Sequence, residues 1–147
     1  MTAGDDNNLH EYRQEGAAEA SVAGVSAMLA EARSFAETSG LGETASYRLM
    51  VVIEELATNI VAHGQPAPGT TIDYALERAP GCVRITMTDS GIPFDPRDLA
   101  KRPPTAALAH QTEGGIGWPL ILQWCRLEAC SRIRDRNQVT LVLEAGA

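Results

Sequence analysis

Residues 51–64 read VVIEELATNIVAHG, and the fold is most directly inferred from this stretch. Its apolar residues, with one just before it, recur at steps of three and four, as on the buried face of a helix: Leu49, Ile53, Leu56 and Ile60. Residues 43–63 contain neither Gly nor Pro, and Gly64 follows directly. We therefore predict an amphipathic helix over residues 43–63.

Polar side chains occupy another face of this helix. Glu55 and Asn59 are four residues apart, and His63 comes one turn later. A carboxylate can take a proton from a hydroxyl group, and an amide oxygen suits Mg²⁺, which also uses waters and substrate phosphates. On its own, this pair is better explained as a solvated polar face, and Glu54 is interpreted as solvated or ion-paired.

The rest of the chain alternates between helical and strand patterns. Spacing, Gly and Pro predict a strand at 9–15, helices at 17–38 and 116–125, a hairpin of 70–77 with 82–88, and a second hairpin of 127–134 with 139–144 around Asp135-Arg136-Asn137. This order favours a two-layer α+β sandwich. Helices would cover one face of a mixed, mostly antiparallel sheet.

Length and charge limit the class of protein. A chain of 147 residues fits one domain over 1–147, with a flexible tail at 1–8. A net charge of -7 argues against direct nucleic-acid binding, which depends on neutralising phosphates. The three cysteines have no CxxC spacing, and we see neither an apolar leader nor a membrane span. We expect a cytoplasmic protein that does not interact with membranes.

Two more motifs lie on either side of a long irregular segment. Residues 89–96 read DSGIPFDP directly after a predicted strand, where a carboxylate can accept a hydrogen bond from an exocyclic amine. Residues 113–117 read EGGIG before a helix, where backbone N–H groups can face phosphate oxygens. Alone, the first is an ordinary turn and the second a hinge. The segment between them has the length of a functional loop or lid.

Together and in this order, the three motifs resemble the N, G1 and G2 boxes of the GHKL (Bergerat-fold) ATPases. The similarity is strongest to the anti-sigma-factor serine/threonine kinases of the RsbW and SpoIIAB type, and it covers roughly residues 8–144. It implies a histidine-kinase-like ATPase fold with an ATP lid over 94–113. The cofactors implied are ATP or ADP and Mg²⁺.

The resemblance also assigns roles to residues. Glu55 would be the general base and Asn59 the Mg²⁺ ligand, with His63 near the pocket. Asp89 would bind the adenine amino group, and Gly91 would let the base approach. The remaining nucleotide contacts implied are Phe94, Gly114, Gly115, Ile116 and Gly117, and the available lid cations are Arg97, Lys101 and Arg102.

The function implied is a kinase that phosphorylates a STAS-domain anti-anti-sigma protein and sequesters a sigma factor, as a homodimer. The alternative is an ATP-binding module that sequesters a partner without phosphorylating it. The catalytic domain of a histidine kinase fits less well, because no dimerisation helix carries a phospho-accepting His. Trp118-Pro119 departs from the family pattern after Gly117, and Pro119 cannot donate a backbone N–H.

Overall fold

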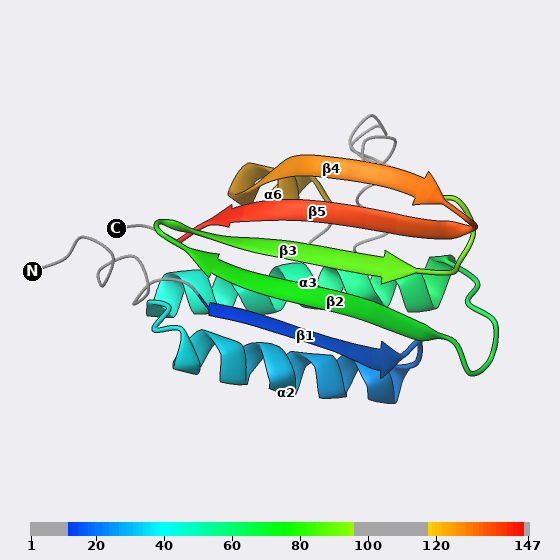
Figure 1. The fold of residues 1–147 in the computed structure, drawn as a ribbon, viewed down its shortest axis with the longest axis horizontal. Helices are drawn as coiled ribbons and strands as arrows, with labels where there is room; N and C mark the ends of the chain where they lie inside the picture. Colours follow the sequence, from blue (N-terminus) through cyan, green and yellow to red (C-terminus); the bar gives the residue numbers. More distant parts are fainter. Residues whose placement is uncertain (1–11, 96–117, 146–147) are drawn as a thin grey trace, which may run out of the picture.

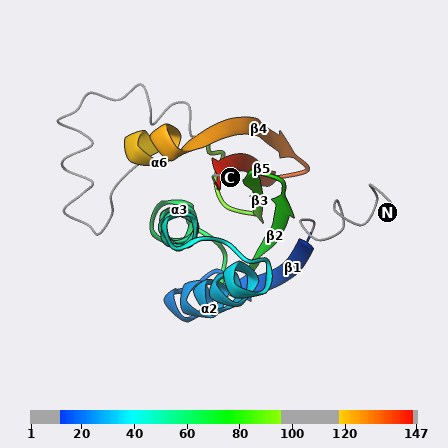
Figure 2. The same ribbon diagram turned by 90° about the vertical axis from the view of Figure 1, so that its left-hand side faces the viewer.

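The computed structural model describes residues 12–95 and 118–145. The elements, in chain order, are β1 (Tyr12–Glu19), α2 (Val22–Thr38), α3 (Glu43–His63), β2 (Thr71–Ala79), β3 (Cys82–Asp89), α6 (Trp118–Trp124), β4 (Cys125–Ile133) and β5 (Arg136–Glu144). The strands form one sheet in the order β1-β2-β3-β5-β4 (Figure 1). The three helices lie on one face of this sheet, and α3 lies between α2 and α6 (Figure 2). The predicted two-layer α+β class is therefore confirmed.

All four strand pairings in the described part of the chain are antiparallel, so the sheet there is not mixed as predicted. The central strands β2 and β3 alternate between buried and half-buried residues, as the sequence pattern indicated. Gly81 adopts a φ of 76° in the turn that joins them, a conformation that glycine adopts without strain.

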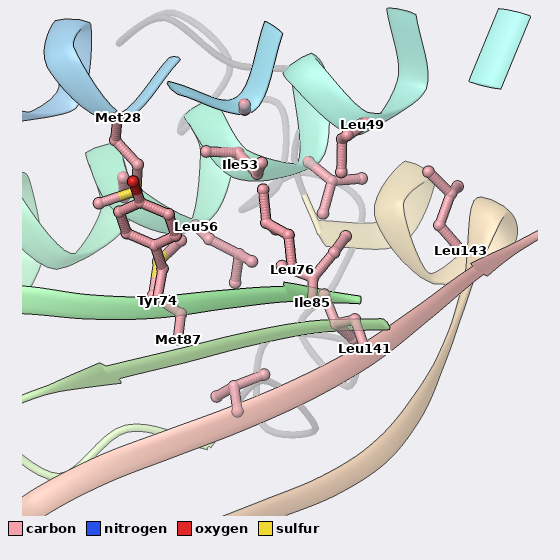
Figure 3. Close-up of a cluster of buried hydrophobic side chains, with 14 of the residues drawn as sticks. Met28, Leu49, Ile53, Leu56, Tyr74, Leu76, Ile85, Met87, Leu141 and Leu143 are labelled. Atoms are coloured by element: carbon pink, nitrogen blue, oxygen red, sulfur yellow. The ribbon is translucent and has the colours of Figure 1, made fainter. Parts of the chain in front are cut away.

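The apolar faces of the helices meet the inner face of the sheet to form the core. Figure 3 shows side chains from α2 and α3 pointing towards those of β2, β3 and β5. The labelled core residues are Met28, Leu49, Ile53, Leu56, Tyr74, Leu76, Ile85, Met87, Leu141 and Leu143. The helix predicted over residues 43–63 is confirmed with those bounds.

The start of the first helix was predicted wrongly. Residues 16–19 continue β1 and pair with β2, and α2 begins only at Val22, after the N-cap Ser21. Ala-rich sequence favours helix, but pairing along the whole of β2 overrides this preference. A Cβ on Gly16 would overlap the hydroxyl of Tyr74, so β1 crosses that side chain closely.

The bounds of the last helix and of the last two strands also differ from those predicted. The described part of the third helix ends at Trp124, and Cys125 already belongs to β4. The second hairpin turns at Arg134 and Asp135, whose φ values are 53° and 62°, so β5 begins at Arg136 rather than after it. Positive φ at both central residues gives the twist that a two-residue hairpin needs. None of the helices in the described residues has the length and apolar character of a membrane span.

Candidate functional site

Asp89 is the last residue of β3 and is 5% exposed. Its Oδ1 accepts hydrogen bonds from the backbone N–H of Gly91 at 2.8 Å and from Nδ2 of Asn137 at 3.1 Å. Both of these bonds end on the same oxygen. A buried polar group needs such partners, and here they also orient the carboxylate.

The loop after β3 packs against the end of α3. The N–H of Ile92 donates to the carbonyl of Gly64, which caps α3, at 2.8 Å. A Cβ on Gly91 would lie 2.5 Å from that same carbonyl oxygen. Gly91 is therefore required for close approach of two backbone segments, and it is not among the residues with positive φ.

Asn137, at the second position of β5, links this loop to the sheet and is 1% exposed. Besides Asp89, its Nδ2 donates to the carbonyl of Ile92 at 2.7 Å. Its Oδ1 accepts from the N–H of Phe94 at 3.1 Å and from Nη1 of Arg132 at 3.0 Å. Sequence reasoning placed Asn137 in a turn and missed it. The sequence offered no clear signal, because Asn137 stands between Arg136 and Gln138 at the polar start of β5.

Phe94 connects this loop to α6. Its ring lies 5.8 Å from the ring of Trp118, centroid to centroid and tilted by 46°. Trp118 is 5% exposed, and its Nε1 is buried without a hydrogen-bond partner among the described residues. The sequence departs from the family pattern at Trp118-Pro119, and there Trp118 places its ring in the core beside the candidate site.

The polar face of α3 lies towards α6. Arg48 contacts Trp124 of α6, with its guanidinium carbon 5.2 Å from the ring centroid. Glu55 and Asn59 follow Arg48 by seven and eleven residues, which are about two and three helical turns. They therefore share the flank of α3 that carries Arg48. Both are half-buried on this α6-facing flank, whereas Glu54 and His63 are exposed.

The described residues bring together only part of the predicted site. Asp89, Gly91 and Phe94 meet at the end of β3, beside the end of α3 that follows Glu55, Asn59 and His63. Gly114, Gly115, Ile116 and Gly117 lie outside the described residues. So do Arg97, Lys101 and Arg102, and so does the predicted lid apart from Phe94 and Asp95.

The described residues offer few donors for a metal ion. No group of three or more His, Cys, Asp or Glu residues in the described ranges could hold a metal ion. Asn59 supplies one neutral oxygen on the α6-facing flank. That donor set fits Mg²⁺ only when phosphates and waters complete the shell, which is how Mg²⁺ is usually held with nucleotides.

Comparisons with known proteins agree with this arrangement. The structure is similar to the RsbU and RsbW domains of Rv1364c from Mycobacterium tuberculosis, with a TM-score of 0.61 and 15% identity over 92% of this chain and 33% of that chain. It is also similar to the SiaB-SiaC complex from Pseudomonas aeruginosa, with a TM-score of 0.53 and 13% identity over 92% of this chain and 91% of that chain.

This chain spans about a third of the Rv1364c chain, and at these identities the likeness shows the fold alone. The search of curated proteins found no match. The family comparison is decisive, because residues 18–143 match the histidine kinase-like ATPase domain. The chain belongs to the histidine kinase-like ATPase domain family.

Proposed function

We propose that this chain is an ATP-dependent serine/threonine kinase that phosphorylates a STAS-domain anti-anti-sigma protein and sequesters a sigma factor. The observation that carries the proposal is the Asp89 carboxylate at the end of β3. Within the described residues, the two hydrogen bonds that it accepts end on Oδ1, which leaves Oδ2 to accept from a ligand. Membership of an ATPase family supports adenine as that ligand.

The phosphate side of the site is assigned to the glycine cluster before α6. Gly114, Gly115, Ile116 and Gly117 would present backbone N–H groups to the phosphates, and residues 94–113 would close over them as a lid. Pro119 lies in the first turn of α6, where its missing N–H would have no helical partner in any case.

Glu55 is the proposed general base. In the transfer, the oxygen of a serine or threonine hydroxyl bonds to the γ-phosphorus, and the bond from that phosphorus to the ADP oxygen breaks. The hydroxyl proton passes to the carboxylate of Glu55. Its half-buried place on the α6-facing flank of α3 supports this role, because α6 is the helix that follows the proposed phosphate site in the sequence.

Asn59 would hold Mg²⁺ through its side-chain oxygen, with phosphates and waters as the other ligands. When bound, Mg²⁺ neutralises phosphate charge during the transfer. His63, exposed at the end of α3, is proposed to lie near the nucleotide.

Partners are proposed from the family likeness. The structural neighbours include one described as an RsbW domain and one solved as a complex of two proteins. We propose that this chain acts as a cytoplasmic homodimer in a partner-switching system, where phosphorylation of the STAS protein releases it and frees the kinase to bind its sigma factor.

Transfer of radiolabelled γ-phosphate from Mg-ATP to a STAS protein encoded beside this chain tests the kinase. Glu55→Gln should lower the transfer rate by about 10²–10⁴-fold, the usual contribution of a general base, with ATP affinity preserved. Asp89→Asn should weaken ATP binding by about 10–100-fold, because a charged hydrogen bond is lost. Glu54→Gln, exposed one residue away, is the control and should match wild type. Transfer by Glu55→Gln at the wild-type rate would refute the base assignment.

The same assay tests the alternative, an ATP-binding module that sequesters a partner without phosphorylating it. Pro119 favours that alternative, since it removes one backbone donor beside the glycine cluster. A wild-type chain that binds ATP and retains the partner, but transfers no label, would establish the module.

A further inference from the structure

We propose that Asn137 and Arg132 are positioning residues of the nucleotide site, which orient the Asp89 carboxylate for an amine-bearing base and tie it to the start of α6. This inference rests on the proposed nucleotide binding. Neither residue belongs to the three motifs from which that site was predicted. Their role follows from hydrogen bonds across three neighbouring strands.

The three side chains lie in one row across the sheet. In the strand register, Asp89 of β3 is opposite Asn137 of β5, and Asn137 is opposite Arg132 of β4. Residues directly opposite one another on adjacent strands place their side chains on the same face of the sheet. The row therefore runs from an exposed arginine at the sheet edge to the buried carboxylate.

The orientation of the Asn137 amide is determined by the backbone. The N–H of Phe94 can only donate, so the atom facing it is Oδ1, and the carbonyl of Ile92 can only accept, so the atom facing it is Nδ2. Nδ2 must then be the atom that faces Asp89, and it donates to Oδ1. With the N–H of Gly91 on that same oxygen, no donor from the described part of the chain occupies Oδ2, which is left for a ligand.

Arg132 holds the other side of the same loop. Its Nη1 donates to the carbonyl of Gly91 at 2.9 Å and to Oδ1 of Asn137 at 3.0 Å. Nη1 of Arg132 thus links the Asn137 side chain to Gly91, whose own N–H is the second donor to Asp89. Hydrogen bonds from a charged donor are the stronger kind, so removing Arg132 should loosen both Gly91 and Asn137.

Phe94 extends this connection to α6. Its N–H is held by Asn137, and its ring packs on Trp118, the first residue of α6. A shift of Asn137 therefore reaches both the adenine contact and the helix that follows the glycine cluster. Trp118 can report on this shift by fluorescence, since the only other tryptophan in the chain is Trp124.

The ratio of the dissociation constants for two nucleotides distinguishes a positioning role from a general loss of stability. ATP carries an exocyclic amine, whereas inosine triphosphate carries a carbonyl oxygen at that position and cannot donate to Asp89. The ratio of the two dissociation constants measures the contacts to the amino group and the neighbouring N1 edge of the base, because phosphates and ribose are common to both ligands. A variant that is merely less stable should weaken both ligands equally.

The test measures both dissociation constants by calorimetry for wild type, Arg132→Ala and the control Arg126→Ala. Arg126 is exposed in the same strand, near its other end, opposite Val142. Arg132→Ala should reduce the preference for ATP by about three- to tenfold, the effect of losing about one hydrogen bond. Arg126→Ala should keep the wild-type preference. In a Trp124→Phe background, Arg132→Ala should also shift the emission of Trp118.

Asn137→Asp provides a second variant of equal size. It keeps an acceptor for Phe94 and Arg132 but replaces the donor to Asp89 by a second carboxylate oxygen, so ATP preference should be lost. If this variant does not fold, Arg132→Ala still decides. A preference unchanged in Arg132→Ala, with a discriminating wild type, overturns this inference alone. A wild type that binds both nucleotides equally overturns the adenine role of Asp89, and this inference with it.

Discussion

At the residue scale, the end of β3 shows how uncharged donors from the described residues accommodate a buried carboxylate. Asp89 is buried, and its hydrogen-bond partners are a backbone N–H and an amide. Burial of a polar group is costly unless such partners are present. Gly91 provides one of them, and the next residue, Ile92, donates its N–H to the carbonyl of Gly64 at the end of α3.

Gly91→Ala should therefore destabilise the protein and weaken nucleotide binding. The added Cβ would lie 2.5 Å from the carbonyl oxygen of Gly64, so one backbone segment must move. We expect a loss of about 1–3 kcal/mol in the free energy of unfolding, the usual cost of overpacking. Urea unfolding measures it.

Gly42→Ala is the matched control, because a Cβ there meets no atom within 4 Å. Its effect should stay below about 1 kcal/mol, the size of a modest N-cap change. Equal stability of the two variants would contradict the close approach at Gly91.

At the element scale, the two long helices begin differently. The Oγ of Ser21 accepts from the N–H of Gly24 at 3.1 Å and caps α2. Gly42 occupies the corresponding position before α3, with a φ of -66° and a ψ of 166°, and provides no side-chain cap. Its backbone conformation and the open space around it both suit serine.

Gly42→Ser should stabilise the protein by about 0.5–1 kcal/mol. The new hydroxyl can accept from an N–H of the first turn, and the unfolded chain loses the extra freedom of glycine. The urea midpoint should rise with an unchanged m value. Ser21→Ala is the opposite comparison and should lose about 1 kcal/mol. A midpoint for Gly42→Ser at or below wild type would show that α3 gains nothing from a cap.

Local pattern predicted most of these elements. Helix α3 was predicted with its observed bounds because its apolar period and flanking Gly are both local. The β2–β3 hairpin was predicted for the same reason. The start of α2 could not be predicted in this way. Residues 16–19 join β1 because they pair with a strand more than fifty residues later in the chain.

At the scale of the whole molecule, one core joins both layers. Cys125, at the start of β4, belongs to this core and is a free thiol. Burial raises its pKa from 9.0 to about 12. Cys82 and Cys130 are also thiols, but they are only half-buried.

Cys125 should therefore report on global unfolding. In the native state it should react with iodoacetamide far more slowly than Cys82, and unfolding in urea should remove the difference, as mass spectrometry of the labelled peptides can measure. Equal labelling rates in the native state would contradict its place in the core.

The burial of Cys125 also predicts how the stability of the protein changes at alkaline pH. Above about pH 9 the thiol ionises in the unfolded chain, whereas in the folded chain it stays protonated up to about pH 12. The unfolded state then binds fewer protons, so stability falls as pH rises through this window. Cys125→Val should reduce that fall.

The candidate site was predicted unevenly. Asp89 and Gly91 follow a strand in a compact motif, so their roles could be inferred from neighbouring residues. Asn137 and Arg132 could not, since their significance depends on partners 48 and 41 residues away along the chain. The aromatic contact of Phe94 with Trp118 likewise joins residues on either side of a long segment.

The amino-acid sequence by itself determined the helix α3, the alternation of the central strands and the residues of the three motifs. These properties depend on periodicity, caps and turns, which act over a few residues. Only the tertiary structure decided that β5 lies between β3 and β4, and so placed Asp89, Asn137 and Arg132 in one row. The physical reason is that strand order and register arise from burying one shared core, which no local stretch of sequence specifies.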